Sequence, residues 1–122
     1  MDVDKQIAAL QADLNAAHHI TYLTGAGVST PSHIPDYRSK NGIYNGISES
    51  PEQILSEETL FHQPAKFHHF VMENMYFPDA KPNIIHQKIA TSCNKNGTLI
   101  TQNVDGLDKK AGNKHVIEFH GD

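Results

Sequence analysis

The chain has 122 residues and a mass of 13.5 kDa, which fits one domain with a core of its own. Hydrophobic residues make up 38% and charged residues 20%, so the composition excludes a disordered, collagen-like or coiled-coil chain. The net charge of −4 and the pI near 6.1 argue against a nucleic-acid-binding domain, which would carry a basic face.

Cysteine content and hydropathy indicate the compartment. The single cysteine, Cys93, cannot form an internal disulfide, which favours a reducing environment. No apolar run approaches the roughly 18 residues of a membrane span, and no signal-peptide pattern opens the chain. We therefore expect a cytoplasmic protein whose partners include neither nucleic acid nor membrane.

Nine histidines raise the question of a metal site, but their spacing argues against one. His18 with His19, and His68 with His69, are adjacent pairs that project to different parts of a helix surface. No Cys-x-x-Cys pair accompanies any histidine, so no residue is assigned as a metal ligand. We expect most of the histidines to lie on the surface.

The chain opens with a predicted helix and a predicted strand. Residues 3–17 space their apolar side chains, Ile7 and Leu10 among them, three and four positions apart, which predicts an amphipathic helix. The β-branched and aromatic content of segment 19–24 predicts a buried strand. Segment 30–50, rich in Pro, Ser, Gly and Asn, is expected to be a long loop with one helical turn.

Helices dominate the middle of the chain. Segments 51–60, 64–76 and 82–94 are each expected to form one helix. Pro51 suits the first turn of its helix, and Gly97 is expected to end the last one.

Two further strands are predicted near the end, at 98–101 and 115–119, with a helical turn at 106–111 between them. Strands that alternate with helices indicate a parallel sheet, so we predict an α/β fold with a Rossmann-like sheet flanked by helices. About three strands are visible, fewer than the four to six of a typical open sheet. We therefore interpret residues 1–122 as one partial domain with an incomplete sheet.

The turn after the first predicted strand reads Gly25-Ala26-Gly27-Val28-Ser29. Glycine lets backbone amides approach a pyrophosphate, because no Cβ stands in the way, and the small and polar residues that follow can open a helix. The third glycine of the dinucleotide fingerprint is missing, so on its own the pair is explained equally well by a structural turn. Its significance comes from distant companion segments.

Together these segments resemble the sirtuin family of NAD-dependent protein deacylases. Four blocks occur in the family's order: Gly25-Ala26-Gly27-Val28-Ser29, Ile34-Pro35-Asp36-Tyr37-Arg38-Ser39, Thr101-Gln102-Asn103-Val104-Asp105-Gly106-Leu107 and His120-Gly121. Pro82-Asn83 followed by His86 resembles a further, structural element of the family. The resemblance implies a Rossmann-like domain paired with a zinc-bearing module, with NAD and an acyl-lysine peptide between them.

The resemblance also implies residue roles. The glycine turn would approach the pyrophosphate of NAD, and Asp36-Tyr37-Arg38 would line the loop over the nicotinamide ribose. Gln102 and Asn103 would hold ribose hydroxyls and the scissile region, while Val104 and Asp105 would contact the nicotinamide carboxamide. His120 would be the general base, with Asn103 as the second catalytic residue. The implied cofactor-binding set is Gly25, Ala26, Gly27, Ser29, Thr30, Asp36, Tyr37, Arg38, Gln102, Asn103, Val104, Asp105 and His120.

Physical reasoning supports these roles. Expulsion of nicotinamide needs a dry pocket that stabilises an oxocarbenium-like centre, so an acidic group near the ribose and an amide anchor are useful. A ribose hydroxyl must then attack, and histidine suits the base because it titrates near neutral pH. His120 follows the carboxyl end of a predicted strand, where open α/β sheets bind ligands.

Structural explanations stay open for the same residues. Asp36 and Arg38 are also explained as a surface pair across a turn. Asn103 and Asp105 are common turn formers after a strand, and they can serve both purposes. His120 taken alone would be a solvated histidine near the end of the chain.

The chain also departs from the family's pattern. His33 stands where the family usually has glycine, so we expect the loop conformation to differ there. Asp108 stands where the family often has histidine, and we expect it to lie outside the chemistry. Tyr37 for Phe and Val104 for Ile are mild changes. Zinc is expected in the full-length family, but its paired Cys-x-x-Cys ligands and the peptide-binding strand do not occur in this sequence.

The preferred hypothesis is a truncated NAD-dependent protein lysine deacetylase or deacylase of the sirtuin type, weakly active or inactive as an isolated chain. Its partners would be NAD and an acyl-lysine protein or peptide. One alternative is a sirtuin-like protein ADP-ribosyltransferase, which uses the same pocket with another acceptor. The other is a non-catalytic remnant that binds nucleotide or associates with a second copy through its incomplete sheet.

Overall fold

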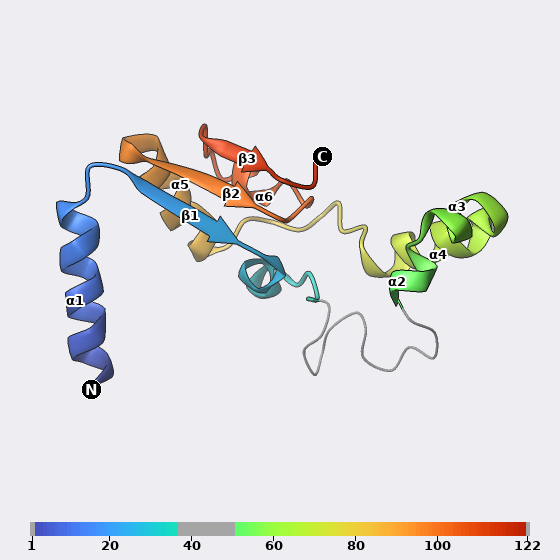
Figure 1. Ribbon diagram of the computed structural model, residues 1–122, viewed down its shortest axis with the longest axis horizontal. Helices are drawn as coiled ribbons and strands as arrows, with labels where there is room; N and C mark the ends of the chain where they lie inside the picture. The colour runs from blue at the N-terminus through green and yellow to red at the C-terminus, as the bar shows by residue number, and fades with distance from the viewer. Residues whose placement is uncertain (1, 37–50, 122) are drawn as a thin grey trace.

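The computed structural model describes residues 2–36 and 51–121. Its strands are β1 (Ile20–Thr24), β2 (Gly97–Thr101) and β3 (Val116–Glu118). They form one three-stranded sheet in the order β1-β2-β3, and both neighbouring pairs are parallel. This confirms the predicted α/β class. Because the strands are parallel, their carboxyl ends all meet at one edge, which Figure 1 shows at the arrowheads.

Helix α5 (Ile84–Asn96) covers one face of this sheet. Side chains alternate along a strand, so the paired residues Tyr22, Leu99 and Val116 all face this helix. Leu99 is completely buried and packs with Cys93 of α5 in the main core. The helix begins two residues later than the predicted segment 82–94 and ends at Asn96, and Gly97 is its C-cap, as expected.

The opposite face of the sheet, here called the outer face, is bare in the part of the chain that the structure describes. The register places Leu23, Ile100 and Ile117 side by side on it. Leu23 is 71% exposed and Ile117 54%, and Phe119 beyond β3 is 70% exposed. Apolar sheet faces ordinarily pack against another layer, so this face has the character of an interaction surface.

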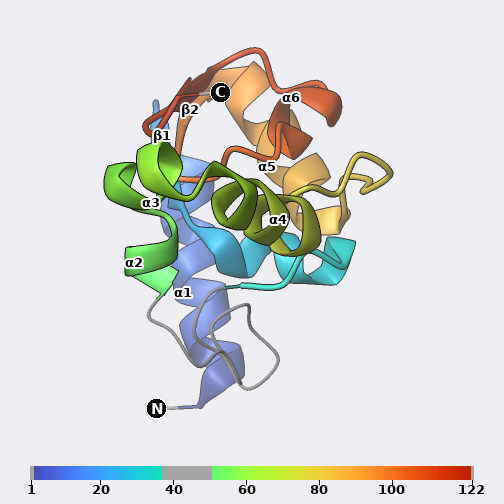
Figure 2. The same ribbon diagram turned by 90° about the vertical axis from the view of Figure 1, so that its right-hand side faces the viewer.

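Helix α1 (Val3–Ala16) matches the predicted amphipathic helix. The Asp2 side chain caps it by accepting a hydrogen bond from the Asp4 N–H at 3.1 Å. However, no residue of α1 is buried, and Ile7 and Leu10 are each 59% exposed. Figures 1 and 2 both show the helix extending away from the sheet, and near its end Leu14 lines a shallow hollow together with Ile20 and Tyr22 of β1.

A second, smaller core lies among the helices α2 (Pro51–Ile54), α3 (Glu57–His62) and α4 (Pro64–Asn74). It is built on Ile54 and Phe70, and Figure 1 shows these helices grouped apart from the sheet. The prediction of one helix over 51–60 is wrong. Two helices form, because Ser56 is an N-cap residue whose side chain accepts from the Thr59 N–H at 3.2 Å and starts α3.

The predicted loop at 30–50 lies partly outside the described residues. Its first part belongs to a 3₁₀ helix, η1 (Ala26–Ser32), that follows β1. A last short helix, α6 (Leu107–Lys110), precedes β3. Of the helices that the structure describes, none has the length and hydrophobicity needed to cross a membrane.

Candidate nucleotide site

The glycine turn lies directly beyond the carboxyl end of β1. Gly25 is the N-cap of η1 with φ −135°, and neither Gly25 nor Gly27 has a positive φ. A Cβ at either position would meet no described atom within 4 Å apart from its chain neighbours. Neither backbone conformation nor packing therefore requires glycine here. What the glycines provide is open space beside the backbone, as a closely approaching ligand needs.

Two side-chain hydrogen bonds join this turn to the segment that follows β2. The Asn103 Nδ2 donates to the Gly25 carbonyl at 2.9 Å, and the Ser29 Oγ donates to the Asp105 Oδ2 at 2.5 Å. The second carboxylate oxygen of Asp105 accepts from the Leu107 N–H at 3.0 Å, at the start of α6. The structure thus brings together two predicted motifs separated by more than 70 residues. We call Gly25, Ser29, Asn103 and Asp105 the junction.

A small cavity of about 50 Å³ opens at the junction. Ser29, Asn103 and Asp105 contribute its polar wall. The rest of its lining is mostly apolar and consists of Ala26, Ile34, Pro35, Asn74, Met75 and Val104. An apolar hollow with a few convergent polar groups is the usual form of a small-molecule subsite.

A larger cavity of about 730 Å³ lies between the end of η1 and segment 76–83. Tyr76, Phe77 and His33 are among its lining residues. Size alone favours this cavity, but it lacks the convergence of hydrogen-bonding groups from two strand ends that marks the junction. We therefore assign the candidate site to the smaller cavity.

The remaining predicted residues divide into three groups. Asp36 is half-buried and directly follows Pro35 of the cavity wall, whereas Tyr37 and Arg38 lie outside the described residues. Thr30 is exposed, and its Oγ1 donates to the Gly27 carbonyl at 2.9 Å rather than facing the cavity. Gln102 is also exposed, while its backbone N–H donates to the Thr24 carbonyl and extends the strand pairing.

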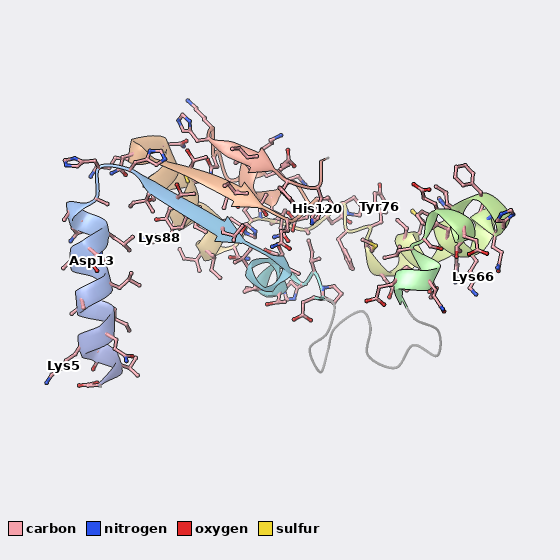
Figure 3. The ribbon with its side chains drawn as sticks, viewed as in Figure 1. Lys5, Asp13, Lys66, Tyr76, Lys88 and His120 are labelled. Carbon is pink, nitrogen blue, oxygen red and sulfur yellow. The ribbon has the colours of Figure 1, made fainter. Side chains whose placement is uncertain are left out.

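His120 is not part of the junction in this structure. It lies just beyond β3, at the same sheet edge, as Figure 3 shows. Its exposed ring packs edge-on against Phe119, with ring centroids 5.2 Å apart, and it does not line the cavity. The predicted base therefore lies at the same edge of the sheet as the junction but does not line its cavity.

His33, where the family's glycine was expected, keeps a left-handed backbone. Its φ is 67° and ψ 24° at the C-cap of η1, and its N–H donates to the Thr30 carbonyl at 3.0 Å. Left-handed conformations favour glycine because a Cβ clashes with the neighbouring carbonyl. Histidine therefore adopts the conformation at this position at an energetic cost.

Sequence reasoning missed the importance of His86. It is completely buried, its Nδ1 accepts from the Asn83 N–H at 3.1 Å, and its Nε2 lies 3.3 Å from the Ser29 Oγ. Asn83 in turn donates through Nδ2 to the Val28 carbonyl at 2.8 Å and the Ser32 Oγ at 2.9 Å. The available signal was the N-cap spacing Asn83-x-x-His86, which forms a capping box at the start of α5.

Asp108 lies under the same site. The side chain is 3% exposed and its Oδ1 has no partner among the described residues. Burial raises the pKa of this carboxyl, attraction to His86 partly offsets the rise, and repulsion from Asp105 and Glu118 adds to it. Asp108 is therefore close enough to His86 and Asp105 to interact electrostatically with the junction.

Cys93 is not a reactive thiol, and the described histidines form no metal cluster. Burial raises the pKa of the Cys93 thiol, so the reactive thiolate is disfavoured. Within residues 2–36 and 51–121, no three His, Cys, Asp or Glu side chains gather closely enough to hold a metal ion.

An open parallel sheet with a glycine turn and a polar junction at its carboxyl edge is the arrangement typical of nucleotide-binding α/β proteins. The particular family follows from sequence comparison. A model of the Sir2 family matches residues 25–122, and the chain belongs to that family.

Relatives and solved structures agree with this assignment. The chain is 59% identical over 113 residues to an NAD-dependent protein deacetylase of Listeria innocua serovar 6a, covering 92% of this chain and 49% of that protein. For a deacetylase of Enterococcus faecalis the identity is 53%, with 84% and 43% covered. This chain thus spans about half the length of the curated relatives it matches.

Among solved structures, one described as "Structural Basis for the Mechanism and Regulation of Sir2 Enzymes" superposes with a TM-score of 0.83 at 32% identity, covering 95% of this chain and 46% of that one. A complex of Sir2 with a p53 peptide and NAD+ gives a TM-score of 0.74 at 34% identity, covering all of this chain and 47% of that one. These matches confirm the predicted Rossmann-like arrangement.

Proposed function

We propose that this chain supplies the NAD-binding part of an NAD-dependent protein deacetylase. The observation that carries the proposal is the junction, in which Asn103 and Asp105 beyond β2 bond directly to Gly25 and Ser29 beyond β1. The relatives from Listeria, Enterococcus and Lactiplantibacillus are NAD-dependent protein deacetylases, which adds support.

The groups around the junction match the pyrophosphate, the carboxamide and the ribose of NAD. The open space at Gly25 and Gly27 suits a pyrophosphate, which needs close approach to the backbone. The carboxylate of Asp105 offers acceptor lone pairs to the N–H groups of a carboxamide, and Val104 and Met75 provide apolar walls for a ring. NAD would supply the electrophilic ribose carbon of the reaction, and Asn103 would hold the ribose next to it.

His120 completes the proposal as the general base. Its place at the carboxyl edge of β3 supports the role, since an imidazole there can accept a proton from a ribose hydroxyl at neutral pH. We also propose a cytoplasmic location, supported by the lone buried cysteine.

Calorimetric titration of the full chain with NAD and with ADP-ribose tests the binding proposal. Asn103→Ala is expected to weaken binding at least tenfold, because it removes the bond that joins the two motifs. Asn94→Ala is the matched control. Its amide also donates to a glycine carbonyl, that of Gly112 at 2.8 Å, but it lies away from the cavity. Equal losses for both variants, or no binding by the unmodified chain, contradict the proposal.

Nicotinamide release from NAD, measured with and without an acetylated peptide, tests catalysis. We expect little or no turnover from these 122 residues, because the described cavity does not enclose a peptide and cannot position an acyl-lysine. Turnover that depends on the peptide and is lost in His120→Ala would overturn that expectation while supporting the role of the base.

The outer face supports a second part of the proposal, that the chain associates with itself. Leu23, Ile117 and Phe119 together expose an apolar surface that water solvates poorly. Light scattering is expected to give a mass above 13.5 kDa, and Leu23→Lys with Ile117→Lys to return it to that value. A monomer at all concentrations contradicts self-association.

A further inference from the structure

A buried histidine lies behind the junction and touches it on one side only. The His86 ring is completely buried, and its two nitrogens have different partners. Its Nδ1 is 3.1 Å from the Asn83 backbone nitrogen, and its Nε2 is 3.3 Å from the Ser29 Oγ. Ser29, itself 1% exposed, continues the chain of contacts to Asp105.

The backbone partner fixes where the imidazole proton lies. A backbone N–H can only donate, so Nδ1 must accept, and a neutral ring then carries its proton on Nε2. That Nε2–H can donate to the Ser29 Oγ, which leaves the hydroxyl proton of Ser29 for the Asp105 carboxylate 2.5 Å away. All the bonds of the series therefore run in one direction, from Asn83 to Asp105.

We propose that His86 is a positioning residue: its Nε2–H donates to the Ser29 Oγ and so orients the Ser29 hydroxyl proton toward Asp105. Asp105 receives one protein donor on each oxygen, from Ser29 and from the Leu107 N–H, and each carboxylate oxygen keeps a further lone pair that can accept from a ligand in the cavity. A group that donates two N–H bonds, such as a primary carboxamide, complements this arrangement. The relevance to nicotinamide rests on the proposed function, whereas the relay itself does not.

A purely structural role for His86 needs only one of its two ring nitrogens. The capping box at the start of α5 needs the Nδ1 contact with Asn83 and nothing from Nε2. The Nε2 contact reaches a different segment, η1, and buries a hydroxyl that bonds to a cavity residue. The carboxylate of Asp108, also near the ring, interacts with it electrostatically and must be controlled for in any test.

The test is nitrogen NMR of the full 122-residue chain with ¹⁵N-labelled histidine. We expect the His86 ring, assigned from its loss in His86→Gln, in the neutral Nε2–H form, with an Nε2 proton that exchanges slowly with water. Asp105→Asn should shift this ring's nitrogen signals, but should have no effect in a Ser29→Ala background, because the relay passes through the Ser29 hydroxyl. This pair of measurements separates the relay from the direct field of the carboxylates.

Two results overturn the proposal. One is an Nδ1–H form of the His86 ring, which needs no variant to detect. The other is a response to Asp105→Asn that is absent, or equally large with and without the Ser29 hydroxyl. Neither readout involves a nucleotide, so failure of the relay is distinguishable from failure of NAD binding.

A ligand measurement then separates positioning from folding. His86→Gln keeps an N–H donor within reach of Ser29, whereas His86→Leu has a similar size and no donor. In nicotinamide titrations we expect His86→Gln to stay within threefold of the unmodified chain and His86→Leu to lose at least tenfold. Equal losses in two folded variants contradict positioning. Absence of nicotinamide binding in the unmodified chain counts against the proposed function and leaves the relay to the NMR result.

Discussion

The junction and the outer face lie on the same three-stranded sheet, yet this chain completes only the first. At the junction, the side chains of Ser29, Asn103 and Asp105 all have protein partners, with Asn103 on Gly25 and Ser29 on Asp105. On the outer face, Leu23 and Ile117 are more than half exposed and have no second layer among the described residues.

The difference shows which part of the candidate site can form from the elements of this chain alone. The junction needs only two strand ends, one short 3₁₀ helix and the start of α5, all of which this chain supplies. His120, the proposed base, lies beyond β3 beside the exposed Phe119, and like the outer face it is exposed. We therefore expect this chain to bind the ligand but to show little or no catalysis.

The sharpest contrast is between two leucines on opposite faces of the sheet. Leu99→Ala removes a completely buried side chain and should lower the free energy of unfolding by about 2–5 kcal/mol. Leu23→Ala changes a residue that is 71% exposed and should cost no more than about 0.5 kcal/mol. Urea unfolding followed by circular dichroism measures both. Similar costs for the two would mean that the outer face is covered after all.

Two glycines separate binding from folding. Gly27→Ala should weaken ADP-ribose binding about tenfold, equivalent to about 1.4 kcal/mol, with little change in stability, because its Cβ enters open space at the junction. Gly112→Ala should do the reverse. Its φ of 91° strains any other residue, and we expect a loss of about 1 kcal/mol in stability with binding intact. Calorimetry and urea unfolding together decide, and a stability loss for Gly27→Ala contradicts the ligand explanation.

The buried carboxyl of Asp108 should make the region under the junction sensitive to pH. Folding raises its pKa, so the folded state binds the proton more tightly, and this group's contribution to stability falls as pH rises from the unfolded pKa through the folded pKa. Asp108→Asn removes that loss. The variant's advantage over the unmodified chain should grow from acidic to neutral pH, to about 1 kcal/mol. A difference that is independent of pH contradicts the assignment.

The smallest expected effect is at the exposed end of η1. His33→Gly relieves a left-handed φ of 67° and should raise the free energy of unfolding by about 0.5 kcal/mol, since the added freedom of the unfolded chain offsets part of the relief. His33→Val, which is β-branched, should lower it by about 1 kcal/mol. Thermal unfolding resolves the pair. The opposite order would show that the His33 side chain makes a compensating contact.

Patterns local to the sequence predicted much of this fold. β-Branched and aromatic content located the first strand, and the order of helices and strands predicted parallel pairing. The break at Ser56 was missed because a capping hydroxyl interrupts an otherwise helical pattern. The exposure of α1 could not be predicted either, because an apolar stripe indicates that a helix can be buried but does not indicate what will cover it.

The candidate site was predictable only in part. The resemblance to the sirtuin family implied roles for Ser29, Asn103 and Asp105, and the structure brings all of them into the lining of one cavity. His86 and Asp108 were undervalued because their importance lies in burial and in contacts between distant segments, which no local pattern records. The role of His120 stays a prediction.

The most direct test of the account is an amide-resolved NMR titration of the full chain with NAD. The account predicts that the largest shifts map to the amides of Ala26, Ser29, Asn103 and Asp105 and that Asn103→Ala suppresses them. Shifts confined to the larger cavity around Tyr76 and Phe77, or no saturable shifts, would contradict it.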